Sequence, residues 1–530
     1  MTEALLLAGG RLPGSSAEGR FSDGGAAVDV VVIDGEIAVI SPAGSGTPKG
    51  FERIELDGRW VVPGLWDNHV HFTQWAAASR RLDVSAGRSA AEVATLVGEA
   101  ARRQATGSPV TDTAAAGGVV GGVELAAGGA GASDVLVGVG FRDGLWADQP
   151  TAALLDAVTG SRPVVLVSAD LHCVWLNSAA LGRFGLDGDA AGSPRGLLRE
   201  DAAFGVHRAL ADTPDAAADA WARDAARAAA SRGVVGVVDL EMAWNAEVWA
   251  RRVAAGHDAL RVEFGVYPHH LDRAVAEGLH TGDPLAGGGG LITVGPLKVI
   301  TDGSLNTRTA FCYDEYPGLE GRADARGLLT VPPAELVELL SRAKAAGFGA
   351  AVHAIGDHAN SLALDAFRAT GIRGSLEHAQ LVAPADLPRF AELGVIASVQ
   401  PEHAMDDRDV ADRYWAGRTG QAFALGGLLA AGATLALGSD APVAPLDPWV
   451  AMAAAVGRAR DGREPWHPEQ RIPAPAALAA STRGRSSVRT GDVADLAVVE
   501  HDPFTASPEA LRAMPVAMTL LAGRATHRAL

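Results

Sequence analysis

Eight short apolar runs, separated mostly by helix-compatible stretches, limit most strongly how this chain of 530 residues can fold. In the clearest helix-like stretch, 332–347, helical spacing is followed by Leu336, Leu339, Leu340 and Ala343, and an apolar run begins just after Gly347. Eight alternating units predict an α/β fold, the TIM (β/α)8 barrel, whose active site lies at the carboxyl ends of the strands. The eight runs are 61–71, 234–239, 260–267, 294–301, 349–353, 372–378, 395–400 and 434–439.

Both ends of the chain are rich in β-type sequence. Near the N-terminus, apolar runs at 26–33 and 36–40 flank Asp34-Gly35, which is a strong signal for a β-hairpin. Similar segments follow at 489–499 and 518–523. We therefore predict a small composite β-sandwich domain built from both termini. Its expected parts are 1–62 and 487–530, and the barrel domain is expected to span 63–486.

The interval from about 80 to 230 is too long for a single loop in a compact domain. We expect it to form an inserted subdomain of the barrel. Its glycine- and alanine-rich stretch, 117–131, is typical of a flexible surface segment. That stretch lacks the strand and helix that flank a phosphate-binding glycine loop, so it does not indicate nucleotide binding.

Composition and charge exclude several classes of protein. The net charge of −18 argues against non-specific binding to nucleic acid, which needs a basic surface. Only two cysteines occur, so no disulfide framework is expected. An acidic residue near the start and a short apolar stretch do not resemble a signal peptide, and no apolar run is long enough to span a membrane. A cytoplasmic protein is the expectation.

The segment 65–72, LWDNHVHF, holds the first candidate for chemistry. In an extended strand, side chains at positions i and i+2 point to the same side. His69 and His71 can therefore converge on one metal ion while Val70 packs behind them. Taken alone, the motif is also compatible with two incidental histidines.

Four other strand ends finish in a potential metal ligand. They carry Lys298, His353, His378 and Asp440. Each has a structural alternative: the histidines could be hydrogen-bonded core residues, the lysine could pair with a carboxylate, and the aspartate could cap a helix. Their joint placement on strands one, four, five, six and eight of one barrel predicts a metal centre instead. Imidazole and carboxylate are the ligands of zinc in open, catalytic sites.

The chain resembles the amidohydrolase superfamily, and within it the YtcJ-like branch that includes N-substituted formamide deformylases. The resemblance covers nearly the whole chain and keeps the order of the motifs. The segments that carry it are 62–71, 297–305, 352–357, 376–380, 397–403 and 438–443, with 170–181 inside the insertion.

The resemblance implies that five side chains surround a divalent metal, with zinc the expected ion: His69, His71, His353, His378 and Asp440. It also implies that Lys298 could be carboxylated and bridge two ions, as in binuclear members. Whether the site holds one ion or two stays open.

In the mechanism that we expect, zinc lowers the pKa of a bound water to about 7, which supplies hydroxide to attack a carbonyl carbon. Asp440 takes the water proton and returns it to the leaving nitrogen. His403, just after strand seven, could stabilise the developing oxyanion. A solvent-facing loop histidine is the alternative.

Four more residues are candidates for binding substrate. His172 and Asn177 could reach over the barrel mouth, although stabilisation of the insertion is the slightly simpler explanation for both. Asp302 and Arg308 follow strand four and could pair to shape the rim. An ordinary surface ion pair is the alternative for those two.

The predicted function is hydrolysis of a carbon–nitrogen bond in a non-peptide amide. An ester or lactone hydrolase, a metal-dependent isomerase or decarboxylase, and a catalytically silent scaffold are the alternatives. Missing ligands would mark the scaffold, and none is missing. The expected partner is a small-molecule substrate; the sequence is compatible with a homodimer but does not specify the oligomeric state.

Overall fold

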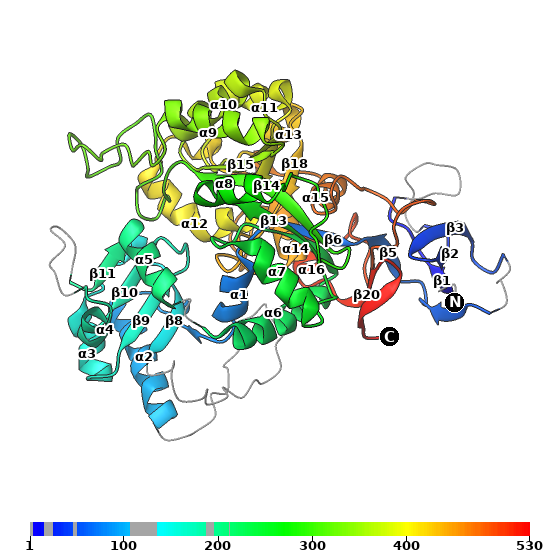
Figure 1. Ribbon diagram of the computed structural model, residues 1–530, viewed down its shortest axis with the longest axis horizontal. Coiled ribbons are helices and arrows are strands. Elements are labelled where there is room, and N and C mark those ends of the chain that lie inside the picture. Colours follow the sequence, from blue (N-terminus) through cyan, green and yellow to red (C-terminus); the bar gives the residue numbers. More distant parts are fainter. Residues whose placement is uncertain (1–3, 15–24, 46–49, 106–134, 187–194, 211–212) are drawn as a thin grey trace.

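The computed structural model describes residues 4–14, 25–45, 50–105, 135–186, 195–210 and 213–530. The predicted flexible stretch 117–131 lies outside these residues. Figure 1 shows a central barrel with an α/β layer on one side and a β-rich part, close to both termini, on the other. No helix of the described segments is long and apolar enough to cross a membrane.

A sheet of eight parallel strands, hydrogen-bonded in sequence order, forms the centre of the molecule. Its two end strands meet through a parallel bridge between Val70 and Ala441, which closes the ring. Each predicted run overlaps one barrel strand, so the TIM barrel is confirmed; the start of the first run, 61–63, belongs instead to a strand of the terminal sheets. The strands are β6 (Leu65–Val70), β12 (Val234–Asp239), β13 (Arg261–Val266), β14 (Ile292–Ile300), β15 (Ala350–Ala354), β16 (Gly374–His378), β17 (Ile396–Val399) and β18 (Leu435–Leu437).

Helices surround the barrel and bury their apolar faces against it. The predicted helix 332–347 is α9 (Pro333–Ala345), which buries Leu336, Leu340 and Ala343 as its spacing indicates. The other helices of this domain are α1 (Phe72–Ala78), α6 (Asp215–Ala230), α7 (Asn245–Ala254), α8 (Pro268–Ala276), α10 (Asp357–Thr370), α11 (Leu387–Leu393), α12 (Pro401–Tyr414), α13 (Leu425–Ala430), α14 (Pro448–Gly457), α15 (Ala474–Ala480) and α16 (Pro508–Arg512).

The two chain ends form two four-stranded sheets that share one hydrophobic core. The predicted hairpin is present, and Asp34 and Gly35 both adopt positive φ angles of 49° and 83°, as a type I′ turn requires. One sheet holds β3 (Glu36–Pro42), β2 (Val28–Ile33), β1 (Ala4–Gly10) and β4 (Glu52–Glu55). The other holds β21 (Arg524–Arg528), β20 (Val516–Leu521), β19 (Leu496–Val499) and β5 (Trp60–Pro63).

The segment between the first and second barrel strands forms its own five-stranded sheet with helices around it. Its last part, α6, packs on the barrel instead, because Ala222, Ala226 and Ala229 join the barrel core. The insertion thus ends before α6. Its elements are β7 (Leu82–Asp83), α2 (Ala90–Ala105), β8 (Leu136–Phe141), α3 (Ala152–Thr159), β9 (Val164–Ser168), β10 (Cys173–Leu176), α4 (Ser178–Arg183), β11 (Leu197–Arg199) and α5 (Asp201–Leu210).

Gly374, at the start of β16, should not tolerate a side chain. A Cβ atom there would lie 1.8 Å from the carbonyl oxygen of Ala350 on β15. We expect Gly374→Ala to lower the free energy of unfolding by about 1–3 kcal/mol or more, because two paired strands must move apart. Denaturant unfolding measures this. The control is Gly205→Ala on α5, where the nearest atom is 3.8 Å away. An equally stable Gly374→Ala variant would contradict the packing described here.

Candidate active site

Three of the predicted metal ligands meet at the carboxyl end of the barrel. The potential ligand atoms of His69, His378 and Asp440 all lie within 4.8 Å of one another. Asp440 Oδ1 is 3.5 Å from Nε2 of His69 and 3.3 Å from Nε2 of His71. All four side chains are buried. The side chains of His69, His71 and Asp440 therefore point toward one place, as the alternation of side chains along an extended strand predicts for the two histidines.

Lys298 and His353 complete the predicted group. Lys298 Nζ lies 3.4 Å from Nε2 of His69, and burial lowers the pKa of this lysine below its ordinary value. The ring of His353 is 4.4 Å from that of His378. All six predicted ligands line one pocket, although they come from five strand ends that are distant in sequence.

The protonation state of three of the imidazoles suits a metal ion. Burial lowers the pKa of His69 to about 4 and also lowers the pKa of His353 and His378. His71 differs: burial lowers its pKa, but the contact with Asp440 outweighs this and raises the pKa above its ordinary value. Neutral imidazole is the form that ligates metals. In addition, Nδ1 of His71 and Nε2 of His353 are buried without a hydrogen-bond partner. Neutral imidazoles, unpaired ring nitrogens and one carboxylate fit a divalent cation.

Two of the histidines are hydrogen-bonded by side chains that were not predicted as site residues, Glu377 and Gln400. Glu377 Oε2 is 2.6 Å from Nδ1 of His69, and Gln400 Oε1 is 2.9 Å from Nδ1 of His378. Such contacts fix the tautomer and turn Nε2 toward the site. A sequence signal existed: both are polar residues at the ends of apolar strand-like runs.

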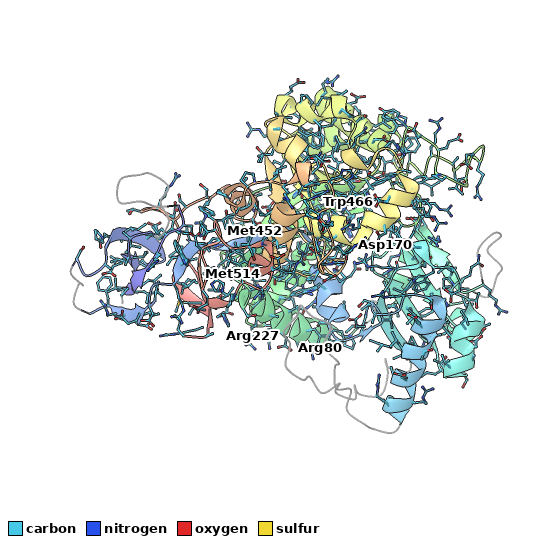
Figure 2. The ribbon with its side chains drawn as sticks, turned by 180° about the vertical axis from the view of Figure 1, so that it is seen from behind. Arg80, Asp170, Arg227, Met452, Trp466 and Met514 are labelled. Atoms are coloured by element: carbon cyan, nitrogen blue, oxygen red, sulfur yellow. The ribbon has the colours of Figure 1, made fainter. Side chains whose placement is uncertain are left out.

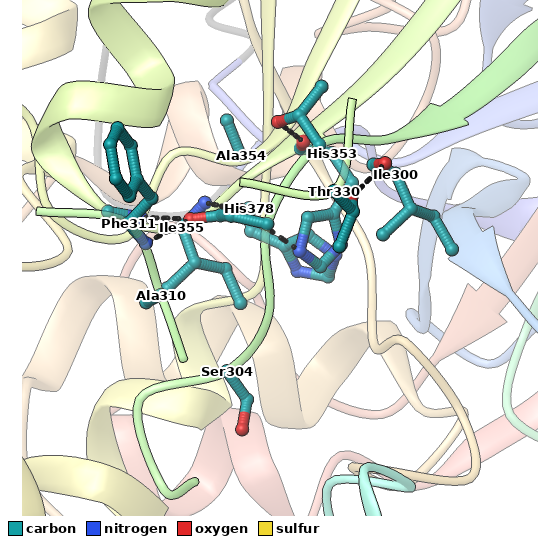
Figure 3. Close-up of polar contacts among 12 residues, drawn as sticks. Ile300, Ser304, Ala310, Phe311, Thr330, His353, Ala354, Ile355 and His378 are labelled. Carbon is teal, nitrogen blue, oxygen red and sulfur yellow. Dashed lines mark hydrogen bonds and ion pairs between the residues drawn. The ribbon is translucent and has the colours of Figure 1, made fainter. Parts of the chain in front are cut away.

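Asp302 has a different role from the one predicted. Its side chain is fully buried and accepts hydrogen bonds from the backbone N–H groups of Phe311, Ile355 and Gly356, at 2.8–3.0 Å. Figure 3 shows Phe311 beside Ile355, with His353 and His378 to the right of them. Asp302 Oδ1 is also 3.4 Å from Nε2 of His353. The carboxylate thus ties the loop after β14 to the end of β15.

No ion pair between Asp302 and Arg308 occurs among the described residues. The guanidinium of Arg308 lies instead over the ring of Tyr414, 5.4 Å from its centroid. The predicted pairing is wrong because the backbone amides described above already occupy the Asp302 carboxylate. Asp302 holds the site together from outside the pocket and does not line it.

The insertion supplies one wall of the pocket. Arg142, Asp170, Leu171, His172 and Phe204 line it together with barrel residues. Figure 2 shows Asp170 where the insertion approaches the barrel. His172 therefore lies where a substrate contact was predicted.

Asn177 does not reach the pocket. Its Oδ1 accepts hydrogen bonds from the N–H groups of Val164 and Ala180, the second of which caps α4. Its Nδ2 donates to the carbonyl oxygen of Arg162 at 2.7 Å. All of these partners belong to the insertion. The predicted substrate contact is thus wrong for Asn177, and the alternative, stabilisation of the insertion, accounts for it.

His403 lies in the first turn of α12 and lines the pocket. It is 4% exposed, which excludes a solvent-facing loop histidine. Its Nδ1 is 3.3 Å from Gln380 Nε2, and its Nε2 is buried without a hydrogen-bond partner. Because Gln380 donates to Nδ1, the Nε2 atom carries a proton that can be donated to a ligand.

The contact between Glu377 and His69 leads to a test. We expect Glu377→Gln to weaken metal binding by about 10–100-fold, because the amide orients the imidazole less strongly than the carboxylate. Titration against a chromogenic chelator measures the affinity. Glu263→Gln is the control, since Glu263 lies on barrel strand β13 and pairs with Arg483 away from the pocket. Equal metal affinity in both variants would show that Glu377 is not a supporting residue.

Comparison with solved structures gives the same fold. An uncharacterised metal-dependent hydrolase from Pyrococcus horikoshii OT3 superposes with a TM-score of 0.73 and 21% identity over 96% of this chain and 99% of that one. One from Pyrococcus furiosus gives a TM-score of 0.69 and 23% identity, over 95% and 100%.

Sequence relatives extend along most of the chain. Protein LONG AFTER FAR-RED 3 of Arabidopsis thaliana is 28% identical over 90% of this chain and 82% of its own. Putative amidohydrolase YtcJ of Bacillus subtilis is 26% identical over 91% of each. N-substituted formamide deformylase of Arthrobacter pascens is 26% identical over 93% and 94%. The model of the Amidohydrolase family matches residues 52–527, so this chain belongs to the amidohydrolase family.

Proposed function

We propose that this protein is a metal-dependent hydrolase that cleaves the carbon–nitrogen bond of a non-peptide amide. The observation that carries the proposal is the buried group of His69, His378 and Asp440, with His71, His353 and Lys298 around it, at the base of a pocket. The similarity to an N-substituted formamide deformylase supports an amide, and within that class a formamide, as the substrate.

The metal is proposed to be zinc, held by the four histidines and Asp440. When bound there, a divalent ion polarises a carbonyl group and makes a water molecule acidic enough to lose a proton near neutral pH. The protein supplies buried imidazoles to hold the ion, and the pKa values of His69, His353 and His378 are lowered, which favours their neutral, ligating form.

Asp440 and His403 are the proposed proton-transfer and hydrogen-bonding groups. Asp440 is the carboxylate of the metal group, so it can take a proton from the attacking water and return it to the leaving nitrogen. His403 can donate its free Nε2–H to the substrate carbonyl oxygen. The two side chains line the same pocket, which supports their acting on one substrate.

Lys298 is proposed to act at the metal as a carbamate. Lys298 is 1% exposed, and its Nζ lies 3.4 Å from His69 Nε2. Burial lowers the pKa of this lysine, which increases the share of the neutral amine, the form that reacts with carbon dioxide. A carbamate would turn a buried cation into an anionic oxygen donor beside the histidines.

A substrate panel on the metal-loaded protein tests the function. N-benzylformamide and other N-substituted formamides are compared with matched esters, lactones and dipeptides, before and after removal of the metal with a chelator. Hydrolysis of formamides that is lost with the metal and returns with zinc is expected. Cleavage of esters alone would replace the proposal with an ester hydrolase. Cleavage of none of them would reject it.

Asp440→Asn should separate catalysis from metal binding. We expect turnover to fall by about 10²–10⁴-fold, because an amide cannot carry the proton. Metal content should fall much less, since the histidine ligands remain. Steady-state kinetics and mass spectrometry of the metal measure both. Asp461→Asn, at an exposed aspartate, is the control. Near-normal turnover with metal in place would show that the proton is carried by another group.

Lys298→Ala should lose activity, and bicarbonate with a short carboxylic acid should partly restore it. The added acid occupies the space left by the side chain and replaces the proposed carbamate oxygens. Lys344→Ala, which removes an exposed lysine that donates to the Thr370 carbonyl oxygen, is the control. High activity of the untreated Lys298→Ala variant would contradict any role of Lys298 at the metal.

A further inference from the structure

Helix α12 presents three polar side chains to the pocket on one helical face. His403, Asp406 and Asp407 all line the pocket, and spacings of three and four residues place them side by side on the helix. The proposed function uses His403 alone. The two aspartates lie about one helical turn beyond it, so they are available to a part of the substrate other than the reacting carbonyl group.

Asp406 is paired with arginines from two parts of the molecule. Its Oδ2 lies 2.9 Å from Nη2 of Arg142, which belongs to the insertion, and its Oδ1 accepts a hydrogen bond from Nη1 of Arg460 at 2.7 Å. Burial would raise the pKa of Asp406, but these two guanidinium groups outweigh burial and hold the pKa below its ordinary value. Asp406 therefore needs no further partner.

Asp407 lacks a comparable partner. Its Oδ1 is 3.8 Å from Nη1 of Arg142, which is beyond hydrogen-bond distance. No group of the described residues donates a hydrogen bond to this carboxylate. Burial raises the pKa of Asp407 to about 6, because Arg142 offsets the burial only in part. An unpaired carboxylate in a pocket costs free energy, and a donor group on a ligand would remove that cost.

The carboxylate that the insertion adds to the pocket, Asp170, is also occupied. It accepts hydrogen bonds from the hydroxyl groups of Ser168 and Ser304, at 2.6 and 3.0 Å, and from the backbone N–H of His172. Among the pocket carboxylates outside the proposed metal group, Asp407 is thus the one that no described residue hydrogen-bonds. A ligand with a hydrogen-bond donor would meet its open acceptor there.

A second observation indicates that a ligand lies along this face of α12. His403 is 4% exposed and lines the pocket, and its Nε2 has no hydrogen-bond partner. Because His403 and Asp407 are four residues apart on one helix, their Cβ atoms lie about 5–6 Å apart. Two open hydrogen-bonding positions at this spacing fit a ligand that carries two polar groups.

We propose that Asp407 is a specificity-determining residue, which binds a positively charged amino group on the nitrogen substituent of the substrate. The substrate class is then an N-(aminoalkyl) formamide, since a formamide carries no substituent on its carbonyl carbon that could reach Asp407. This inference rests on the proposed amide hydrolysis. A cation is favoured over a neutral donor, because a hydrogen bond between two charged groups is about twice as strong as a neutral one. Arg142, held by Asp406, leaves Asp407 to the substrate.

Kinetics of the metal-loaded protein with two matched formamides test the role. N-(Aminobutyl)formamide and N-pentylformamide have chains of equal length that end in an ammonium and a methyl group. The wild type should have the higher kcat/KM for the ammonium compound. Asp407→Asn should lower this preference by about 10–100-fold, with little change in kcat/KM for the neutral compound. The control is Asp409→Asn, at an exposed aspartate of the same helix that pairs with Arg463.

Two results would overturn the proposal. One is a wild type that shows no preference for the ammonium compound, and the other is an Asp407→Asn variant that keeps the full preference. The comparison of the two compounds on the wild type needs no variant, so it decides alone if Asp407→Asn does not fold.

A binding measurement separates this inference from the proposed function. If the wild type cleaves no amide, the proposed function fails, and the same two compounds then serve as stable ligands for calorimetry. The ammonium compound should bind more tightly than the neutral one to the wild type and to Asp409→Asn, and this difference should disappear in Asp407→Asn. No difference between the compounds on the wild type, including no binding of either, would overturn the role of Asp407.

Discussion

Closure of the barrel between its first and last strands is the contact on which the active site depends. The backbone N–H of Asp440 donates to the carbonyl oxygen of His69 at 2.7 Å, and that of His71 donates to the carbonyl oxygen of Ala441 at 2.8 Å. These two bonds bring the His-x-His segment and the Asp440 carboxylate side by side, although most of the chain lies between them in the sequence. Without them, Asp440 would follow an open edge strand.

Buried polar groups behind the site strengthen the same closure. Asp67 Oδ1 accepts from the backbone N–H groups of Ser439 and His69, and Asn68 donates to the carbonyl oxygen of Leu437 at 2.8 Å. Burial raises the pKa of Asp67 to about 7. Burying such groups is costly unless each is hydrogen-bonded. The segment 67–71 thus contributes side chains to both functions: Asp67 and Asn68 hold the seam, and the histidines face the pocket.

Local sequence patterns were sufficient for the barrel and for the metal group. A buried parallel strand appears in the sequence as a continuous apolar run. Once the direction of that strand is known, a residue at its carboxyl end can be assigned to the active-site face of the barrel. What the sequence could not reveal depends on contacts between distant elements. Glu377 was overlooked because its partner, His69, lies on another strand. Helix α6 was assigned to the insertion because its alanine-rich sequence does not show which sheet its buried face contacts.

The predicted substrate contacts also depended on contacts between distant elements that the sequence does not show. Asn177 and His172 lie five positions apart in one motif, yet one caps a helix inside the insertion and the other lines the pocket. The neighbouring sequence does not distinguish a helix cap from a pocket residue, because each role depends on which hydrogen-bond donors and acceptors the fold brings near the side chain. For Asp302, the sequence suggested an ion pair with Arg308. In the structure, three backbone N–H groups donate to its carboxylate instead.

The barrel and the insertion contribute differently to the proposed chemistry. The barrel strand ends supply the proposed metal ligands, whose positions are fixed by the closed sheet. The insertion meets the barrel at the loop after β14 and at α12, through Ser304 with Asp170 and through Arg142 with Asp406. Since these contacts shape the wall of the pocket that the insertion supplies, a change in the insertion could alter substrate choice while every proposed metal ligand stays in place. The specificity of this enzyme should therefore be sought in the insertion and in the α12 residues that it contacts, and its reaction type at the barrel strand ends.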